Sequence, residues 1–209
     1  MVIKTEYAAE NRRFAVNYIE AHRYVVNRLE GELSDDLVYH GLHHTLDVIE
    51  TTELIAKSEG LSLQEITMVK TAALYHDTGF IFEYENNERL AIDLAQETLP
   101  EFGYTYSEIE IISGMIEATI SHIKPRNHWE QIMVDADFDY FGREDFEAIA
   151  ETLYKELIKH GTEYSAKQWD EVQMLFLQKH RYYTNFSIEN RLPIKQKSLS
   201  KLIERLSKY

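Results

Sequence analysis

Apolar residues recur every three or four positions through most of the chain rather than alternating with polar residues. This spacing places apolar side chains on one face of a helix, whereas regular alternation would predict a strand. Only 3 prolines and 8 glycines occur among the 209 residues, so helix breakers are few. The pattern predicts an all-α fold.

The first predicted helices lie in the N-terminal half. One covers about residues 6–29 and ends at Gly31-Glu32-Leu33-Ser34. Its apolar stripe consists of Phe14, Tyr18, Val25 and Leu29. The next begins at the capping sequence Ser62-Leu63-Gln64-Glu65, whose end residues can bond to each other's backbone amides. It runs to near Asp77, with Gly79 as the expected breaker.

Five further helices are predicted after residue 80. Four of them cover about residues 88–99, 143–160, 166–184 and 194–207. The fifth starts at a second capping sequence, Ser107-Glu108-Ile109-Glu110, and is bounded by Pro125. Pro100 ends the helix of residues 88–99. Gly142 precedes the long amphipathic helix of residues 143–160, and Gly161 ends it.

The composition limits the class of protein. With 44% hydrophobic residues, a chain of this length can bury a full core, and we expect one domain over residues 1–209. The sequence has no cysteine, so a bound metal must use histidine, carboxylate and water. We find no secretory leader after Met1 and no apolar run of membrane-span length, which predicts a cytoplasmic protein without a membrane partner.

The charge balance limits the partners. The formal net charge is -14, from 22 Lys and Arg against 36 Asp and Glu. This balance disfavours a nucleic acid polymer as partner, because contacts with its phosphates need concentrated positive charge. A small phosphorylated substrate remains compatible, since a metal ion and a few local cations act at short range.

Candidate metal ligands occur at three points in the chain, namely His44, the pair His76-Asp77, and Asp137. Imidazole and carboxylate together suit zinc, iron, manganese and similar ions, and ligands from several helices can leave positions open for water. Adjacent residues on a helix point about 100° apart, so His76 and Asp77 can share an ion only at a helix end or in a distorted last turn. The sequence therefore predicts a divalent metal site.

The flanking sequences extend this motif. His44 lies in Tyr39-His40-Gly41-Leu42-His43-His44-Thr45-Leu46-Asp47-Val48, and Asp137 lies in Asp135-Ala136-Asp137-Phe138-Asp139-Tyr140. In order, spacing and flanking residues, about residues 35–160 resemble the HD superfamily of metal-dependent phosphohydrolases. The resemblance implies an HD-domain helical bundle with the N-terminal helix and the helices of residues 166–207 packed on it. It also implies that His44, His76, Asp77 and Asp137 bind the ion.

The last ligand has three candidates, Asp135, Asp137 and Asp139. Residues two apart on a helix lie on nearly opposite faces, so neighbouring members of this set cannot both face the ion. The resemblance selects Asp137, which follows a small residue and precedes a short apolar-Asp-Tyr run. Asp135 is the alternative, with a role in orienting His44 or His76. Asp139 is expected to be solvated or to cap a helix.

His40 is a candidate general acid. In the cyclic-nucleotide phosphodiesterases, whose site resembles that of the HD family, a Tyr-His-Asn sequence precedes the first metal histidine by four residues and its histidine protonates the leaving oxygen. Tyr39-His40-Gly41 has this spacing before His44, with Gly41 in place of asparagine. A structural or substrate-contacting role is the alternative for His40. His43 is expected at the surface.

Glu88 is a second catalytic candidate, because Asn86-Asn87-Glu88 resembles the Asn-His-Glu stretch that follows the His-Asp pair in related predicted phosphohydrolases. It would polarise the attacking water or support a ligand. The alternative is that Glu88 only stabilises a helix N-terminus, and Glu83 and Glu85 are expected to form a solvated acidic turn. Asp77 is counted as both a ligand and a catalytic residue.

Substrate contacts are expected from His122, Lys124 and Arg126. His122 follows a helix and could reach a second ion or the substrate phosphate, and the two cations lie just beyond it. Two cations in a loop can equally be solvated charge, which is the alternative. His180-Arg181-Tyr182-Tyr183-Thr184 and Arg191 are similar to the tail of a subgroup of predicted HD hydrolases and would line the pocket mouth.

One divalent ion is expected, and Mn, Zn, Fe, Ni, Co and Mg are all compatible. HD proteins with two metals add histidines between the His-Asp pair and the final aspartate, and this interval offers only His122 and His128. A second, weakly held ion through Asp77 and His122 is left open. The missing histidines argue against the diiron oxygenase branch of the superfamily. His128 is expected in a loop.

The resemblance therefore implies an enzyme that cleaves a small phosphoester, with a nucleotide as the expected substrate. The ion would lower the pKa of water, and the resulting hydroxide would attack phosphorus. The alternative is a regulatory or sensor module that binds metal and nucleotide without turnover, for which Gly41 and the lack of a clear phosphate-binding cluster leave room. The oligomeric state is open, with a homodimer as one candidate.

Overall fold

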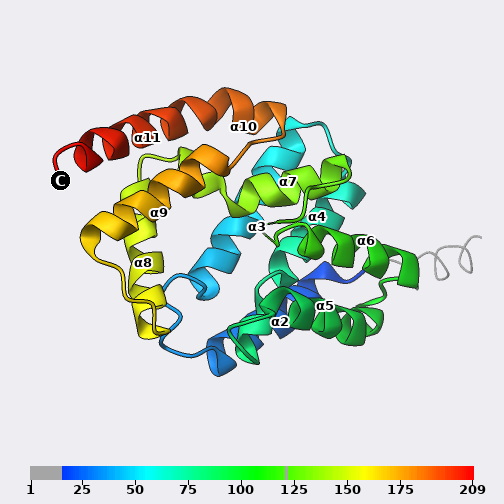
Figure 1. Cartoon of the computed structure of the whole chain (residues 1–209). Helices are drawn as coiled ribbons and strands as arrows, with labels where there is room; N and C mark the ends of the chain where they lie inside the picture. Colours follow the sequence, from blue (N-terminus) through cyan, green and yellow to red (C-terminus); the bar gives the residue numbers. More distant parts are fainter. Residues whose placement is uncertain (1–15, 121) are drawn as a thin grey trace, which may run out of the picture.

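The computed structural model describes residues 16–120 and 122–209, whose helices are arranged as in Figure 1. Within these ranges the chain forms α-helices and short 3-10 helices and no strand, which confirms the predicted all-α fold. No helix in the described part has both the length and the apolar character needed to span a membrane. Residues 6–15 of the first predicted helix, including Phe14, lie outside the described ranges.

Short 3-10 helices separate several of the α-helices. In chain order the elements are α2 (Tyr18–Glu32), α3 (Leu42–Ser58), α4 (Leu63–Tyr75), η1 (Thr78–Ile81), α5 (Asn87–Thr98), η2 (Leu99–Phe102), α6 (Tyr106–Glu117), α7 (His128–Asp137), η3 (Asp139–Gly142), α8 (Phe146–Lys159), α9 (Ala166–Lys179), α10 (Asn185–Asn190) and α11 (Leu192–Leu206).

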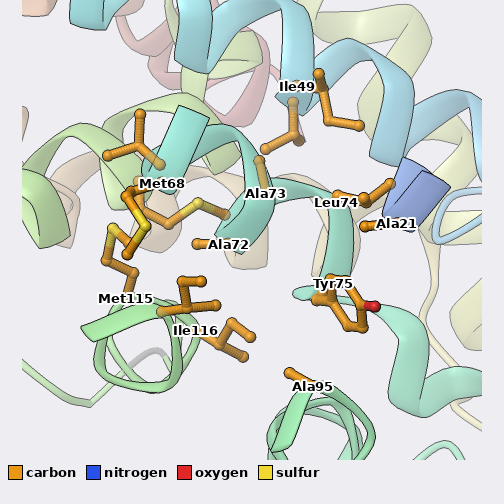
Figure 2. Close-up of a cluster of buried hydrophobic side chains, with 14 of the residues drawn as sticks. Ala21, Ile49, Met68, Ala72, Ala73, Leu74, Tyr75, Ala95, Met115 and Ile116 are labelled. Atoms are coloured by element: carbon orange, nitrogen blue, oxygen red, sulfur yellow. The ribbon is translucent and has the colours of Figure 1, made fainter. Parts of the chain in front are cut away.

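The helices from α2 to α7 in chain order enclose a mainly aliphatic core, and α4 lies at its centre. α4 packs against α2, α3, α5, α6 and α7. Figure 2 shows Ala72 on the side of Met115 and Ile116 of α6, and Leu74 on the other side, next to Ala21 of α2. Because consecutive residues of α4 are buried, the helix is enclosed on all sides rather than on one face. Burial of each large apolar side chain contributes about 1.5–3 kcal/mol, so the end of α4 is firmly positioned.

A second core is rich in aromatic residues and joins η3, α8, α9 and α11. Its buried members are Tyr39, Tyr140, Phe141, Phe146, Ala150, Trp169, Leu177, Tyr182 and Leu202. α9 and α11 pack against each other, in orange and red at the top of Figure 1. Tyr39 precedes α3, whose residues Val48 and Ile49 belong to the first core. The start of α3 therefore connects the two cores.

The two predicted capping sequences have different outcomes. Ser62 caps α4 and forms the predicted capping box with Glu65. The second prediction was two residues late, because α6 is capped by Thr105 with Glu108 as its partner. The segment fits the capping pattern in both registers, so the pattern alone does not choose between them. Buried Tyr104 precedes the true cap and anchors the chain there.

Several predicted helix boundaries also move. α2 continues through Gly31 to Glu32, and the helix predicted for residues 166–184 ends at Lys179. His128, expected in a loop, is the first residue of α7. Asn127 caps that helix through its side chain, a signal that the sequence contained.

Gly79 has a different role from the breaker predicted for it. It lies inside η1, and a Cβ atom on it would come within 1.7 Å of the carbonyl oxygen of Asn87. This close approach requires glycine, because any side chain would push the start of α5 away from η1. Gly79 thus lets α5 close over the turn that carries Asp77.

Candidate metal centre

The four side chains predicted as metal ligands converge where α3, α4 and α7 meet. His44 comes from the first turn of α3, His76 and Asp77 follow α4, and Asp137 is the last residue of α7. His44, His76 and Asp77 are buried and form a group that could hold a metal ion. The backbone leaves the helical conformation at Asp77 (φ -105°, ψ 7°), as the sharing of one ion by adjacent residues requires.

The spacing of the ligand atoms suits one small cation. The Nε2 atoms of His44 and His76 are 3.4 Å apart. The Oδ2 atom of Asp77 lies 3.4 and 3.2 Å from these two nitrogens, and Oδ1 of Asp137 lies 3.2 and 3.5 Å from them. Donor atoms about 2.0–2.2 Å from a shared ion are about 2.8–3.6 Å apart in tetrahedral or octahedral geometry. The donor atoms of His44, His76 and Asp77 are therefore close enough to share one ion, and Oδ1 of Asp137 lies near both histidine nitrogens.

Two hydrogen-bonding features support the same fit. Nδ1 of His76 is 2.7 Å from the carbonyl oxygen of Ala73, to which it donates, so in the neutral ring the lone pair is on Nε2 and faces the other donors. Oδ2 of Asp77 is buried and has no hydrogen-bond partner among the described residues. An unpaired buried carboxylate oxygen is costly, and a cation would compensate it.

The charges of the site are tightly linked. Burial lowers the pKa of His76, but the carboxylates of Asp77 and Asp137 outweigh it and raise that pKa well above its usual value. Burial raises the pKa of Asp77, and the charge of His76 overcomes this and lowers it. The carboxylates are thus ionised, and an arriving cation would displace the proton from His76, so metal affinity should fall in acid.

Glu156 of α8 is a residue that the sequence analysis missed. It is fully buried, and its Oε2 accepts hydrogen bonds from the backbone amides of Tyr39 (2.7 Å) and His40 (3.0 Å). Its Oε1 bonds to Nδ1 of His40, whose ring stacks on Phe80 with centroids 4.3 Å apart. The available signal was a carboxylate on the apolar face of α8, three residues after Leu153.

Glu156 also sets the charge state of His40. Burial lowers the pKa of His40, but the hydrogen bond to Glu156 and the nearby carboxylates of Asp77 and Asp137 raise it above its usual value. The result is an imidazole that retains its proton to higher pH than a solvent-exposed histidine.

A cavity of about 800 Å³ lies beside these residues. Asp77, Asp137, His40 and Glu88 line it, and so do residues at the end of α9. Much of its wall is apolar and aromatic, including Phe80, Ile120, Phe138, Phe141, Leu153 and Phe176. Volumes of roughly 300–1,000 Å³ with a few convergent polar groups are typical of small-molecule sites.

Comparison with known proteins identifies the fold. No family model and no curated protein matches the sequence. A solved structure described as a predicted HD superfamily hydrolase, from an uncultured Thermotogales bacterium, matches with a TM-score of 0.56 and 21% identity, over 89% of each chain. The chain has the HD-domain fold. The predicted helical class is thereby confirmed, and the roles of individual residues depend on the geometry described above.

Within this HD domain, the three predicted substrate contacts lie elsewhere than the cavity wall. Arg126 pairs with Glu117 (2.8 Å) and Glu130 (3.1 Å) and does not line the cavity, so its phosphate contact remains a prediction. His122 and Lys124 are exposed and do not line the cavity, and their roles remain predictions. Among the described residues, His122 is absent from the group that could hold a metal, so no second ion is indicated there.

The two aspartates beside Asp137 have structural partners. Asp135 is fully buried and accepts hydrogen bonds from the amides of Tyr183 and Thr184, and it does not orient His44 or His76. This corrects the alternative role considered for it. Asp135 instead fixes the chain between α9 and α10.

Asp139 was expected to be solvated or to cap a helix, and the structure contradicts both, because Phe138 is the N-cap of η3 and Asp139 is buried. It is 1% exposed and accepts a hydrogen bond from Nε of Arg191 at 2.6 Å. Arg143 lies 3.9 Å away on its other side. Arg191, predicted at the pocket mouth, is therefore engaged in this buried pair, whereas Arg181 does line the cavity.

Proposed function

We propose that the protein is a metal-dependent hydrolase that cleaves a small phosphoester, with nucleotides as the substrate class. The spacing of the four donor atoms carries this proposal, together with a cavity large enough for a nucleotide that Asp77 and Asp137 line. The fold shared with a predicted hydrolase supports it. A divalent cation held by His44, His76, Asp77 and Asp137 would supply Lewis-acid activation of water and of the phosphoryl group.

His40 would act as the general acid. Its Nδ1 is bonded to Glu156, which leaves Nε2 as the nitrogen that can carry a proton to the leaving oxygen. His40 lines the same cavity as Asp77, so both can face one substrate. Glu156 would then be a positioning residue, because it orients the ring and holds the proton on it without touching the substrate.

Glu88 and the aromatic wall would complete the site. Glu88 lies in the first turn of α5 and lines the cavity, where it can orient a water molecule. Phe138, Phe141 and Phe176 present ring surfaces on which a nucleobase can stack. The net charge of -14 argues for a small anion rather than a nucleic acid polymer.

The test combines metal content with turnover. Elemental analysis of wild type and Asp137→Ala, followed by phosphate release from a panel of nucleoside monophosphates and diesters, should show near-stoichiometric metal and turnover only in wild type. Asp93→Ala, an exposed change on α5, is the matched control and should behave as wild type. Metal without turnover would favour a non-catalytic metal- and nucleotide-binding module, and absence of metal after supply of Mn²⁺, Zn²⁺ and Fe²⁺ would overturn the proposal.

A further inference from the structure

A buried lysine is paired with a histidine on the cavity wall. Lys195 in the first turn of α11 is 5% exposed, and its Nζ lies 2.6 Å from the carbonyl oxygen of His180 and 3.1 Å from Nδ1 of the same residue. Lys195 forms no ion pair with the carboxylates of the described residues. Its ammonium contacts the two acceptors of His180 and lies over the Tyr182 ring, 5.4 Å from the ring centroid, an unusual arrangement for a buried charge.

This contact fixes the tautomer of His180. An ammonium group only donates hydrogen bonds, so Nδ1 must accept and the ring proton is on Nε2. Burial and then the charge of Lys195 lower the pKa of His180 to about 3, so the ring is neutral at physiological pH. Burial lowers the pKa of Lys195 to about 8, which still leaves it protonated at pH 7.

The Nε2–H group of His180 has no acceptor among the residues that the structure describes. Nε2 is buried and lacks a hydrogen-bond partner among the described residues, while the residue lines the cavity. The ring lies beside Phe138, Phe141 and Tyr182, with centroids 5.4, 5.1 and 4.5 Å away, and none of them accepts a hydrogen bond from Nε2. A buried donor without a partner is costly, and a ligand in the cavity that His180 lines would compensate it after a small movement of the ring.

The position relates this donor to the metal centre. Phe138 follows Asp137 directly, so the His180 ring contacts the residue next to a candidate ligand. Arg143 and Arg191, the nearby guanidinium groups, are already paired with carboxylates. Lys179 and Arg181 line the cavity from exposed positions and would attract an anion without fixing its orientation.

We infer that His180 binds an anionic phosphate oxygen of the substrate through Nε2–H, and that Lys195 fixes the donor tautomer and supplies positive charge behind the ring. The inference rests on the proposed function and assigns its substrate anchor. An anionic acceptor is favoured over a neutral base carbonyl, because the ammonium strengthens a hydrogen bond to charge more than one to a neutral group. His180 is then a substrate-binding residue and Lys195 a positioning residue.

The first test observes the donor directly. Long-range ¹H–¹⁵N spectra of the Zn²⁺-loaded protein should show His180 as the Nε2–H tautomer, with His180→Gln identifying its signals. Inorganic phosphate should shift the Nε2 resonance in wild type, and Lys195→Met should give mixed tautomers and a weaker response. A shift with an uncharged nucleoside but none with phosphate would overturn the anionic acceptor, and an Nδ1–H tautomer in wild type would overturn the whole inference.

The second test uses any phosphoester that the wild type hydrolyses. His180→Phe fills the aromatic site without a donor and should raise KM by about 10- to 100-fold with little change in kcat, as expected for loss of a hydrogen bond to a charged group. His180→Gln should recover part of the loss, since its amide can donate from a similar place. His128→Gln, exposed on α7, is the control.

The outcomes separate this inference from the proposed function. Normal turnover with unchanged KM in His180→Phe would overturn the inference and leave the hydrolase proposal standing. Absence of turnover in wild type, together with a phosphate-dependent shift of His180, would overturn the hydrolase proposal while supporting phosphate recognition at this residue.

Discussion

The two hydrophobic cores of this HD domain differ in what they hold in place. The aliphatic core contains Tyr75 and Ala136, which immediately precede the candidate ligands His76 and Asp137. The aromatic core contains residues such as Tyr39 and Tyr182, and beside it lie buried polar pairs. These pairs are His40 with Glu156, Asp139 with Arg191, and His180 with Lys195.

The difference indicates a division of tasks. Apolar packing is dense and non-directional, and it fixes the helix ends from which the metal ligands extend. Hydrogen-bonded pairs are directional, and those of His40 and His180 set a charge state and a tautomer. The aliphatic core would thus determine the geometry of the metal ligands. The polar pairs beside the aromatic core would determine how a substrate is bound and how its leaving oxygen is protonated.

The largest effect on activity is expected from the replacement of a metal ligand that the aliphatic core positions. Asp77→Ala removes a donor that contacts the nitrogens of both His44 and His76, so metal retention and hydrolysis should be lost together. Elemental analysis and phosphate release measure the two properties, and circular dichroism should show retained helices. A variant that stays active without metal would contradict the role of the ion.

A smaller loss of activity is expected from the replacement of His40, beside the aromatic core. His40→Ala should keep the metal but slow cleavage of esters with poor leaving groups by about 10²–10⁴-fold, the usual contribution of a general acid. Esters with good leaving groups should be affected much less, because they need no proton. Equal effects on both kinds of ester would remove the acid role and leave a structural one.

The same division explains which features could be predicted from the sequence. Helix periodicity and the capping box at Ser62 are local, so the all-α class and the start of α4 followed from neighbouring residues. The cap at Thr105 was misplaced because two registers fit locally and a tertiary anchor decided between them. The candidate ligands could be named because they carry the motif themselves.

The polar pairs could not be predicted in the same way. Asp139 bonds to Arg191 across 52 residues, and Asp135 bonds to Thr184 across 49. Glu156 meets His40 across 116 residues. No periodic pattern specifies such partners, because they depend on how α8 meets the segment before α3 and how the chain around α10 and α11 packs on α7 and η3.

Asp139 provides a test of stability without a change in the metal centre. Asp139→Asn leaves Arg191 without its charged partner, and we expect a loss of about 3 kcal/mol in the free energy of unfolding, near the lower end for buried pairs because the arginine is partly exposed. Urea denaturation measures this change, with Asp35→Asn as an exposed control. A loss no larger than the control's would show that Asp139 is not stabilising.

The smallest expected effect concerns the pH dependence that Glu156 imposes on His40. Burial lowers the pKa of His40 and the Glu156 carboxylate helps raise it above the usual value, so the protonated acid should persist to higher pH in wild type. Activity that needs this proton falls as pH rises through that pKa. Glu156→Gln keeps a carbonyl acceptor but loses the charge, so the fall in activity should move to lower pH, with a several-fold lower rate above neutrality and similar rates in acid.

A kcat profile against pH measures the shift, and exposed Glu151→Gln on α8 is the control. Coincident profiles for wild type and Glu156→Gln would show that the carboxylate does not hold the proton on His40.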